Sequence, residues 1–211
     1  AKNRVKGAIA MVEAGAKTII MDDGLQNPSL LKDLSLCVID GTYGIGNGRV
    51  IPAGPLREEF EYSLQKSNAV VILGLDQAGI AEQIKRITPD MIIIKAQIKA
   101  EPTDLDFTSQ PVHAFAGIAQ PEKFFITLNE LGCTLAKTTA FTDHHAYTDA
   151  EVSELIEAAQ ADKALLLTTE KDYVRLDTKW QSAVKPLGIR LEWEDEAPLT
   201  ALLEPIIRFA S

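Results

Sequence analysis

Short apolar runs alternate with helical patterns along most of the chain. The runs are about four to eight residues long, rich in Val and Ile, and of strand length. Between them apolar residues recur every third or fourth position, for example after Asp149, and this spacing is typical of amphipathic helices. The alternation predicts parallel β-α-β units, and therefore an α/β fold rather than a β-sandwich.

The pattern predicts a definite order of elements in the first half of the chain. A helix is expected to end at Gly15, where a strand over residues 17–21 follows. Next come a strand over 36–39, a glycine-rich loop over 41–55, a helix over about 57–66, a strand over 69–73, a helix over about 79–87 and a strand over 91–98.

The second half restarts the pattern, so we expect two lobes. Its strands are expected at 112–117, 134–141, 164–168 and 189–193, and its helices at 121–131, from Asp149, around 172–176 and from about Pro198. Residues 100–110 are aperiodic and acidic, which is typical of a connection. We therefore predict two parallel-sheet α/β/α lobes, over residues 1–98 and 112–211, joined by a linker over 99–111, with a cleft between them.

Composition and charge narrow the possible partners. Hydrophobic residues make up 46% of the 211 residues and charged residues 24%, as in a soluble globular protein. A net charge of −9 argues against non-specific binding to nucleic acid. The two cysteines, Cys37 and Cys133, lie in apolar segments and are expected to be buried and free. No apolar run reaches the roughly 18–20 residues that span a bilayer. Since the first residue is Ala1, we expect the natural protein to begin upstream and this fragment to be soluble.

The first candidate for chemistry is the acidic string DDGLQ at residues 22–26. It follows the apolar run at 17–21, and ligands gather at the carboxyl ends of strands in open α/β sheets. Two adjacent carboxylates, Asp22 and Asp23, suit a divalent cation beside a nucleotide. The alternative is an acidic turn after a buried strand.

The second candidate is the glycine-rich loop over residues 41–55 and the segment that follows it. Its glycines permit close backbone approach to phosphate oxygens, although Arg49 after Gly48 excludes a Walker A motif. The string PAGPLRE at 52–58 stiffens the end of the loop and presents Arg57, a bidentate phosphate donor, at a helix start. A merely flexible loop is the alternative.

Two further polar strings follow predicted strands in the second half. Of the three histidines, His144 and His145 are adjacent and follow Asp143, and one of them suits a general base or a ligand contact. The alternative is a surface pair, and His113, inside an apolar strand, is expected to be structural. The string TTEKD at 168–172 also follows a predicted strand, but taken alone it is better explained as the cap of a short helix.

Together, and in this order, these strings resemble the tetraacyldisaccharide 4'-kinase family, whose members phosphorylate a lipid A precursor in Gram-negative bacteria. The matching strings are DDGLQ at 22–26, GNG at 46–48, PAGPLRE at 52–58, AGI at 116–118, PEKFF at 121–125, DHH at 143–145 and TTEKD at 168–172. The resemblance implies ATP- and Mg²⁺-dependent transfer of the γ-phosphoryl group to the 4'-hydroxyl of a lipid A disaccharide precursor. It also implies a site on the cytoplasmic face of the bacterial inner membrane.

The resemblance assigns roles to individual residues. Asp22, Asp23 and Glu58 correspond to metal-binding positions. His144 corresponds to the histidine that pairs with an aspartate of the family's N-terminal part to activate the acceptor hydroxyl. Asp143 and Arg57 are also expected at catalytic positions, Arg57 at the phosphates, whereas His145 is the weaker candidate. Contacts to the nucleotide are expected from Gln26, Asn47, Glu170, Lys171 and Asp172.

The family's N-terminal part, with its membrane-associating helix and Walker A loop, is absent from these 211 residues. Positioning and charge stabilisation dominate phosphoryl transfer, so we expect the fragment alone to be inactive or nearly so. Two other functions stay open: a metal-dependent phosphoesterase, and a nucleotide-binding module without catalytic activity.

Overall fold

The chain folds into two compact units, which are described separately. The computed structural model describes residues 3–102 and 109–210, except for the side chains of 209 and 210. Unit 1 comprises residues 1–98 and 191–211, and unit 2 comprises residues 99–190. The chain leaves unit 1 along one strand and returns along another, and these two strands are neighbours in one sheet.

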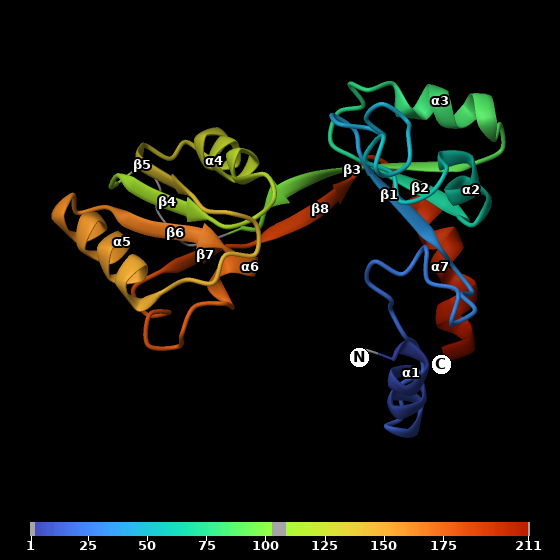
Figure 1. The fold of residues 1–211 in the computed structure, drawn as a ribbon, viewed down its shortest axis with the longest axis horizontal. Helices are drawn as coiled ribbons and strands as arrows, with labels where there is room; N and C mark the ends of the chain where they lie inside the picture. Colours follow the sequence, from blue (N-terminus) through green and yellow to red (C-terminus); the bar gives the residue numbers. More distant parts are fainter. Residues whose placement is uncertain (1–2, 103–108, 211) are drawn as a thin grey trace. The chain divides into compact units, whose positions relative to one another are not determined.

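Unit 1 is built on a four-stranded sheet in the order β1-β2-β3-β8 (Figure 1). Strands β1, β2 and β3 run parallel, with Leu36 opposite Ala69 and Ala69 opposite Ile92. The elements are α1 (Arg4–Glu13), β1 (Leu36–Asp40), α2 (Phe60–Gln65), β2 (Ala69–Leu73), α3 (Ile80–Ile87), β3 (Ile92–Ala100), β8 (Ile189–Trp193) and α7 (Ala197–Ala210).

Strand β2 is buried on both faces, which explains its unbroken apolar sequence. Val70 and Ile72 pack against residues of α2 and α3, including Leu64 and Ile84. Ala69 and Val71 face the other way and pack against α7. The helices therefore form layers on both sides of the sheet, as expected for parallel strands.

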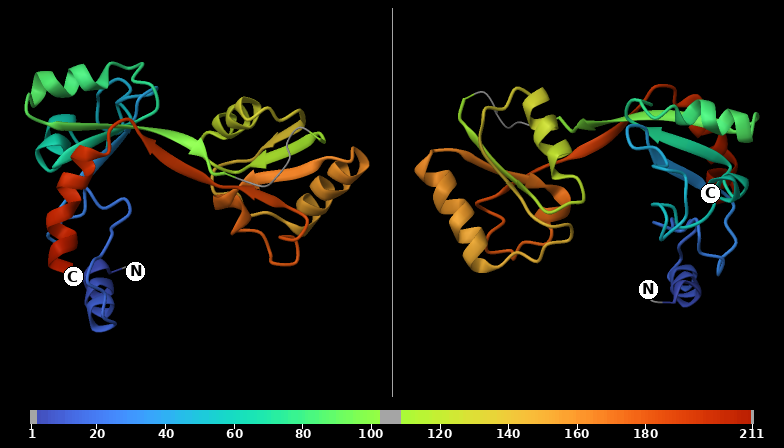
Figure 2. Two further views of the ribbon diagram at one scale, coloured as in Figure 1. Left: turned by 180° about the vertical axis from the view of Figure 1, so that it is seen from behind. Right: turned by 45° about the horizontal axis from the view of Figure 1, so that its top comes forward.

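Unit 2 is built on a second four-stranded sheet, in the order β5-β4-β6-β7. All three pairings in it are parallel. Figure 2 shows α4 and α5 on opposite sides of this sheet, in agreement with the two apolar clusters that they form with it. Its elements are β4 (Val112–Ala116), α4 (Pro121–Glu130), β5 (Leu135–Ala140), α5 (Asp149–Ala161), β6 (Leu165–Thr169), α6 (Glu170–Tyr173) and β7 (Lys185–Leu187).

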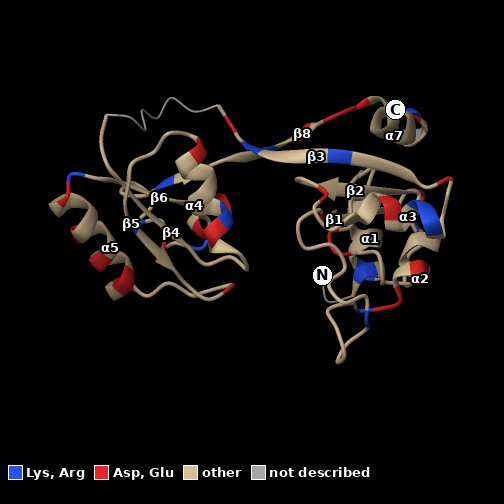
Figure 3. Cartoon of the chain, turned by 90° about the horizontal axis from the view of Figure 1, so that it is seen from above, with Lys and Arg blue, Asp and Glu red and all other residues tan. Residues whose placement is uncertain are grey.

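Local sequence signals fix the ends of the helices in unit 2. Helix α4 begins with Pro121 and is followed by Gly132, whose φ of +83° is a conformation that glycine adopts without strain. Helix α5 begins at a capping box formed by Thr148 and Glu151. Acidic residues recur along the outer side of α5 (Figure 3). No helix among the described residues is long and apolar enough to cross a membrane.

The structure contradicts the predicted strand over residues 17–21. These residues form no strand, and Ile20 is 90% exposed. A strand needs a neighbour for its backbone hydrogen bonds, and the segment is paired with none of the described strands. Asp22 and Asp23 therefore follow an irregular segment and not a strand.

The boundary between the lobes also differs from the prediction. Residues 191–211 return to unit 1, although the sequence pattern assigned them to the second lobe. The reason is packing: Leu199, Leu202 and Leu203 of α7 cover the face of β2 that α2 and α3 leave open. The predicted linker over 99–111 begins inside β3, and its residues 103–108 lie outside the described residues.

Phe115 is the largest side chain that is completely buried in unit 2, where it contacts the rings of Phe141 and Tyr147. Replacing it with Ala is expected to lower the free energy of unfolding by about 3–5 kcal/mol, because the cavity persists after the ring is removed. Urea denaturation measures this difference. The control is Ile126→Ala on the outer side of α4, where 55% of the residue is exposed and a change below about 0.5 kcal/mol is expected. Equal effects at the two positions would contradict the packing described above.

Candidate active site

Four of the predicted site residues in unit 1 line one hollow. Asp23, Gln26, Arg57 and Glu58 surround a space of about 260 Å³, together with apolar residues of β1 and the glycine-rich loop. Asp22 and Asn47 do not line it. The sequence strings at 22–26 and 52–58 are thus brought together although they are far apart in the chain.

Arg57 and Asp23 form the ionic contact of this hollow. Arg57 Nη1 donates to both carboxylate oxygens of Asp23, at 2.8 and 2.9 Å. The two side chains are 60% and 61% exposed, so that water screens their attraction. The hydrogen bond to Asp23 raises the pKa of Arg57 above its ordinary value. Arg57 is therefore charged at neutral pH, and both side chains are accessible to a ligand.

Glu58 precedes α2 and forms hydrogen bonds with residues in and directly after this helix. Its Oε1 accepts hydrogen bonds from Ser63 Oγ at 2.7 Å and from Lys66 Nζ at 2.6 Å. Burial by itself raises the pKa of Glu58, but hydrogen bonds from Lys66 and Ser63, the Lys66 charge and a hydrogen bond from Gln26 outweigh burial. The net effect is a pKa below the ordinary value of 4.5. Glu58 thus anchors the start of α2.

Asn47 holds the glycine-rich loop together. Its Nδ2 donates to the carbonyl of Ala53 at 2.8 Å, and its Oδ1 accepts from the N–H of Arg49 at 3.1 Å. A Cβ on Gly54 would lie 2.1 Å from Asn47 Oδ1, so only glycine fits there. The structure therefore gives Asn47 a role in shaping the loop.

The acidic residues were tested as a set of metal ligands. Arg57 engages both oxygens of Asp23, and Lys66 engages both oxygens of Glu58. Among the described residues, no group of three or more His, Cys, Asp or Glu is placed to hold a metal ion. Mg²⁺ usually needs only one or two carboxylates, with phosphates and water completing its shell. The adjacent Asp22 and Asp23 fit that smaller demand, and Glu58 does not.

A second cluster of predicted residues lies in unit 2 around Asp172, whose side chain is completely buried. Its Oδ2 accepts from the N–H of Gly117 at 3.0 Å and from Thr169 Oγ1 at 2.7 Å. Its Oδ1 lies 3.4 Å from Arg175 Nη1. We refer to Gly117, His144, Thr169, Asp172 and Arg175 as the Asp172 cluster.

His144 is positioned by its backbone and by its ring. Its φ of +59° lies in the left-handed region, and its N–H donates to the carbonyl of Gly117 at 3.0 Å. The ring Nδ1 lies 2.7 Å from Arg175 Nη2, and Nε2 lies 3.6 Å from Asp143 Oδ2. Lys171 Nζ is 3.8 Å from the other oxygen of Asp143. Asp143, His144 and Lys171, predicted from two strings, therefore meet on the surface of unit 2.

The remaining histidines have structural roles. His145 stacks on Phe141 at 4.6 Å and its Nε2 lies 3.1 Å from Glu151. Hydrogen bonds from Thr148, and then from His145, lower the pKa of Glu151 to about 2. His113 is 2% exposed within β4, as predicted. Glu170 is exposed at the first position of α6, and no contact places it in the cluster.

Sequence reasoning missed three members of this region. Arg175 lies three residues after Asp172, a spacing that places two side chains on one face of a helical turn, and this signal could have revealed it. Gly117 occurs in the matching string AGI, but its space requirement depends on the tertiary fold. Tyr147 packs against Gly117, and burial, followed by the charge of Asp172, raises the pKa of its phenol.

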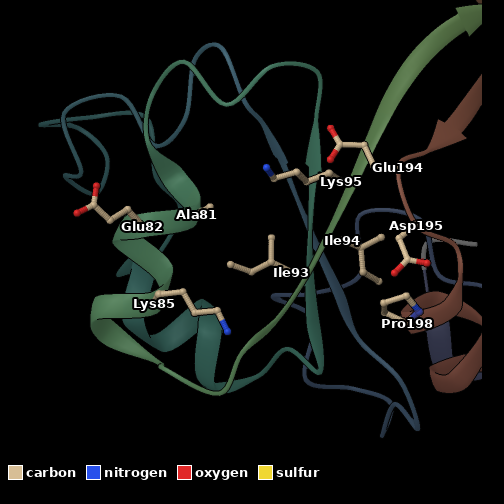
Figure 4. Close-up of a pocket in the computed structure, with 9 residues that line it drawn as sticks. All are labelled: Ala81, Glu82, Lys85, Ile93, Ile94, Lys95, Glu194, Asp195 and Pro198. Carbon is tan, nitrogen blue, oxygen red and sulfur yellow. The ribbon is translucent and has the colours of Figure 1, made fainter.

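A second hollow of unit 1 is lined by none of the predicted site residues. It has a volume of about 530 Å³ and lies between α3, β3 and the start of α7. In Figure 4, Ile93 points toward α3 and Ile94 toward Pro198. We assign no function to this hollow, because its lining comes from the contact of the sheet with α3 and α7.

The chain was compared with protein families and with known proteins. The family model described as LpxK, tetraacyldisaccharide-1-P 4'-kinase, matches residues 1–208. The chain belongs to this family. The tetraacyldisaccharide 4'-kinase of Paramagnetospirillum magneticum is 43% identical over 203 residues, which cover 96% of this chain and 62% of the relative. That of Rhodospirillum centenum is 42% identical over 208 residues, covering 98% and 61%.

A solved structure in the family supports the fold. It is the crystal structure of LpxK from Aquifex aeolicus in complex with ATP, with a TM-score of 0.70 and 23% sequence identity. The match covers 96% of this chain and 62% of that protein. The chain thus spans about 62% of the length of the Paramagnetospirillum magneticum and Aquifex aeolicus proteins.

Gly117→Ala is expected to destabilise unit 2. The added Cβ would lie 2.8 Å from Tyr147 Oη and 3.2 Å from Asp172 Oδ1. Because Gly117 has no positive φ, the cost arises from crowding, and about 1–3 kcal/mol of unfolding free energy should be lost. Urea denaturation followed by tryptophan fluorescence measures this loss. A loss below about 0.5 kcal/mol would show that the Asp172 cluster accommodates a methyl group at position 117 without crowding.

Glu58→Gln is expected to change how stability depends on pH. Because the folded-state pKa of Glu58 lies below 4.5, the ionised group stabilises the fold above that pH. This contribution is lost as the pH falls through the folded-state pKa, so the difference between wild type and variant should shrink between about pH 6 and about pH 3. Urea denaturation at several pH values checks this, with Glu59→Gln at the exposed neighbouring position as the control. A difference that stays constant with pH would refute the assignment.

Proposed function

We propose that the protein is an ATP-dependent kinase that transfers the γ-phosphoryl group to the 4'-hydroxyl of a lipid A disaccharide precursor. The observation that supports this most strongly is the family match over residues 1–208. It favours phosphoryl transfer over the phosphoesterase and the inactive binding module. The Aquifex aeolicus family member was solved in complex with ATP, which supports ATP as the donor here.

Unit 1 is proposed to contact the phosphates of the nucleotide. Arg57 already binds an anionic group through Nη1, and its guanidinium carries further N–H donors that suit phosphate oxygens. Because the pair is exposed, a phosphate could replace Asp23 at little cost in free energy. Gln26 is within the same hollow and is proposed to contact the nucleotide, and Asn47 is proposed to do so through the loop that it shapes.

Asp22 and Asp23 are the residues proposed to hold Mg²⁺. The ion, when bound, would offset the negative charge on the phosphates. Asp22 makes no side-chain hydrogen bond or ion pair among the described residues, and Asp23 becomes available when Arg57 turns to a phosphate. Glu58, the third predicted ligand, is proposed only as a support for this region because Lys66 and Ser63 occupy its oxygens.

Unit 2 is proposed to contribute a group, His144, that acts where the phosphoryl group passes to the acceptor hydroxyl. His144 is 68% exposed and thus accessible to a ligand, while its neighbour Asp143 completes a polar pair. Lys171 adds a positive charge beside Asp143, and Glu170 is accessible at the start of α6. Asp172 is proposed to act through the loops it holds, since its side chain has no exposed surface.

The acceptor carries acyl chains, so the reaction is proposed to take place at the cytoplasmic face of the inner membrane. The 211 residues contain no G-x-x-x-x-G-K-Ser/Thr loop to surround the phosphates. We therefore expect them to transfer little or no phosphate by themselves, and assays of transfer should use the protein as its organism expresses it.

His144→Ala tests the proposal in that protein. Removing a group that works at the reacting oxygen is expected to lower kcat by about 10²–10⁴-fold. The dissociation constant of ATP should change only a few-fold. Transfer of labelled phosphate from ATP to tetraacyldisaccharide 1-phosphate provides the measurement.

The adjacent His145 offers a matched control. His145→Gln removes a ring that packs on Phe141 and should leave kcat within a few-fold of wild type. Absence of transfer in the wild-type protein would refute the kinase proposal. Equal losses in the two variants would refute the role assigned to His144.

A further inference from the structure

Arg175 is held firmly and points one arm of its guanidinium at His144. Its Nη1 lies 3.4 Å from Asp172 Oδ1 and donates to the carbonyl of Gly117 at 3.3 Å. Its Nη2 is left to face His144 Nδ1, at 2.7 Å. The side chain of Arg175 is only 24% exposed, and that of Asp172 is completely buried. The direction of the guanidinium is therefore set by groups other than His144.

This contact decides where the imidazole carries its proton. A guanidinium is protonated at every nitrogen and only donates hydrogen bonds. His144 Nδ1 must therefore accept, which it does with its lone pair. A neutral imidazole then carries its hydrogen on Nε2. An imidazolium would set one N–H against another and would have to turn away from Arg175.

The charged groups around the ring form two ion pairs. Asp143 and Lys171 lie on the Nε2 side, where their charges are 3.8 Å apart. Asp172 and Arg175 lie on the Nδ1 side and also form a pair. Each cation is thus matched by a carboxylate.

We propose that Arg175 is a positioning residue that fixes His144 as the Nε2–H tautomer, so that His144 meets its ligand as a hydrogen-bond donor. The ligand oxygen follows from the proposed function, on which this inference rests: a phosphoryl oxygen, which is an anionic acceptor. A base at this position would need a free lone pair on the ring. Nε2 carries the hydrogen, and the Nδ1 lone pair is occupied by Arg175. This differs from the acid-base role that the resemblance implied for His144.

The ring nitrogens of His144 report the tautomer directly by ¹⁵N NMR. The 211-residue chain contains three histidines, so replacing His113 and His145 in turn assigns every signal. In the wild type, Nδ1 should have the chemical shift of an unprotonated nitrogen and Nε2 that of a protonated one. Nδ1 in the protonated form, or an average between the two tautomers, would overturn the proposal.

Variants at position 175 separate this role from the ring's own preference. Arg175→Met should move the His144 signals toward the tautomer average of free imidazole. Lys171→Met, which removes the other nearby cation without touching Nδ1, should leave them in place. The signals of His113, buried in β4, show whether each variant is folded, and Arg175→Leu, which also lacks a donor, takes its place if Arg175→Met is not. Unchanged His144 signals in a folded variant at position 175 would refute the role of Arg175.

A second experiment tests the donor role during transfer, in the protein as its organism expresses it. The side-chain amide of Gln can place an N–H near the position of His Nε2 but has no titratable lone pair. If His144 donates a hydrogen bond to an anionic oxygen, kcat of His144→Gln should exceed that of His144→Ala by about tenfold or more. Equal kcat values would indicate a base and overturn the proposal. If the wild type transfers no phosphate, the proposed kinase function fails, while the ring-nitrogen signals still decide the role of Arg175.

Discussion

The buried carboxylate of Asp172 is the interaction on which the second unit's candidate site depends. Taking a charge out of water is costly unless hydrogen bonds and a counterion replace the lost hydration. Here the hydrogen bonds come from Gly117 at the end of β4 and from Thr169 at the cap of α6, and the counterion is Arg175 in the turn after α6. The carboxylate therefore joins three segments, and the carbonyl of Gly117 extends the network to the backbone of His144. A carboxylate, which only accepts hydrogen bonds, is suited to a position faced by donors alone.

The hollow of unit 1 has the opposite character. Its ion pair between Arg57 and Asp23 is exposed, and such pairs contribute only about 0–1 kcal/mol. An arrangement of this kind can exchange one anion for another without disturbing the fold. Unit 2 thus presents a histidine in a fixed orientation, whereas unit 1 presents charged groups that can rearrange around a phosphate.

Local signals in the sequence were sufficient to predict most helices and strands. They were insufficient where the structure of a segment depends on contacts with residues far away in the chain. The apolar run of β2, Pro121 at the start of α4 and the cap at Thr169 each carry their own reason for the structure found. Residues 17–21 have the composition of a strand but no partner among the described strands. Helix α7 returns to unit 1 because one face of its sheet is otherwise uncovered. The hydrophobic periodicity of α7 predicts a helix but not the sheet against which the helix packs.

For the candidate site too, the sequence predicted some features and could not predict others. The strings DDGLQ, PAGPLRE, DHH and TTEKD identified the side chains that gather in each unit, because a site needs particular chemical groups. The contacts of these side chains depend on the tertiary packing. Glu58 accepts a hydrogen bond from Lys66, and His144 accepts one from Arg175, a residue outside all of the strings. Chemistry could therefore be predicted from residue types, but the orientation and protonation of each group could not.

Hydrogen exchange in Asp172→Asn tests most directly whether this carboxylate holds the site together. An amide of the same shape offers one acceptor oxygen in place of two, so one of the donors from Gly117, Thr169 and Arg175 must lose its partner. The account predicts faster exchange of the backbone N–H groups of Gly117 and His144, with the amides of the β6 core unchanged. Unchanged protection at Gly117 and His144 in the folded variant would contradict it.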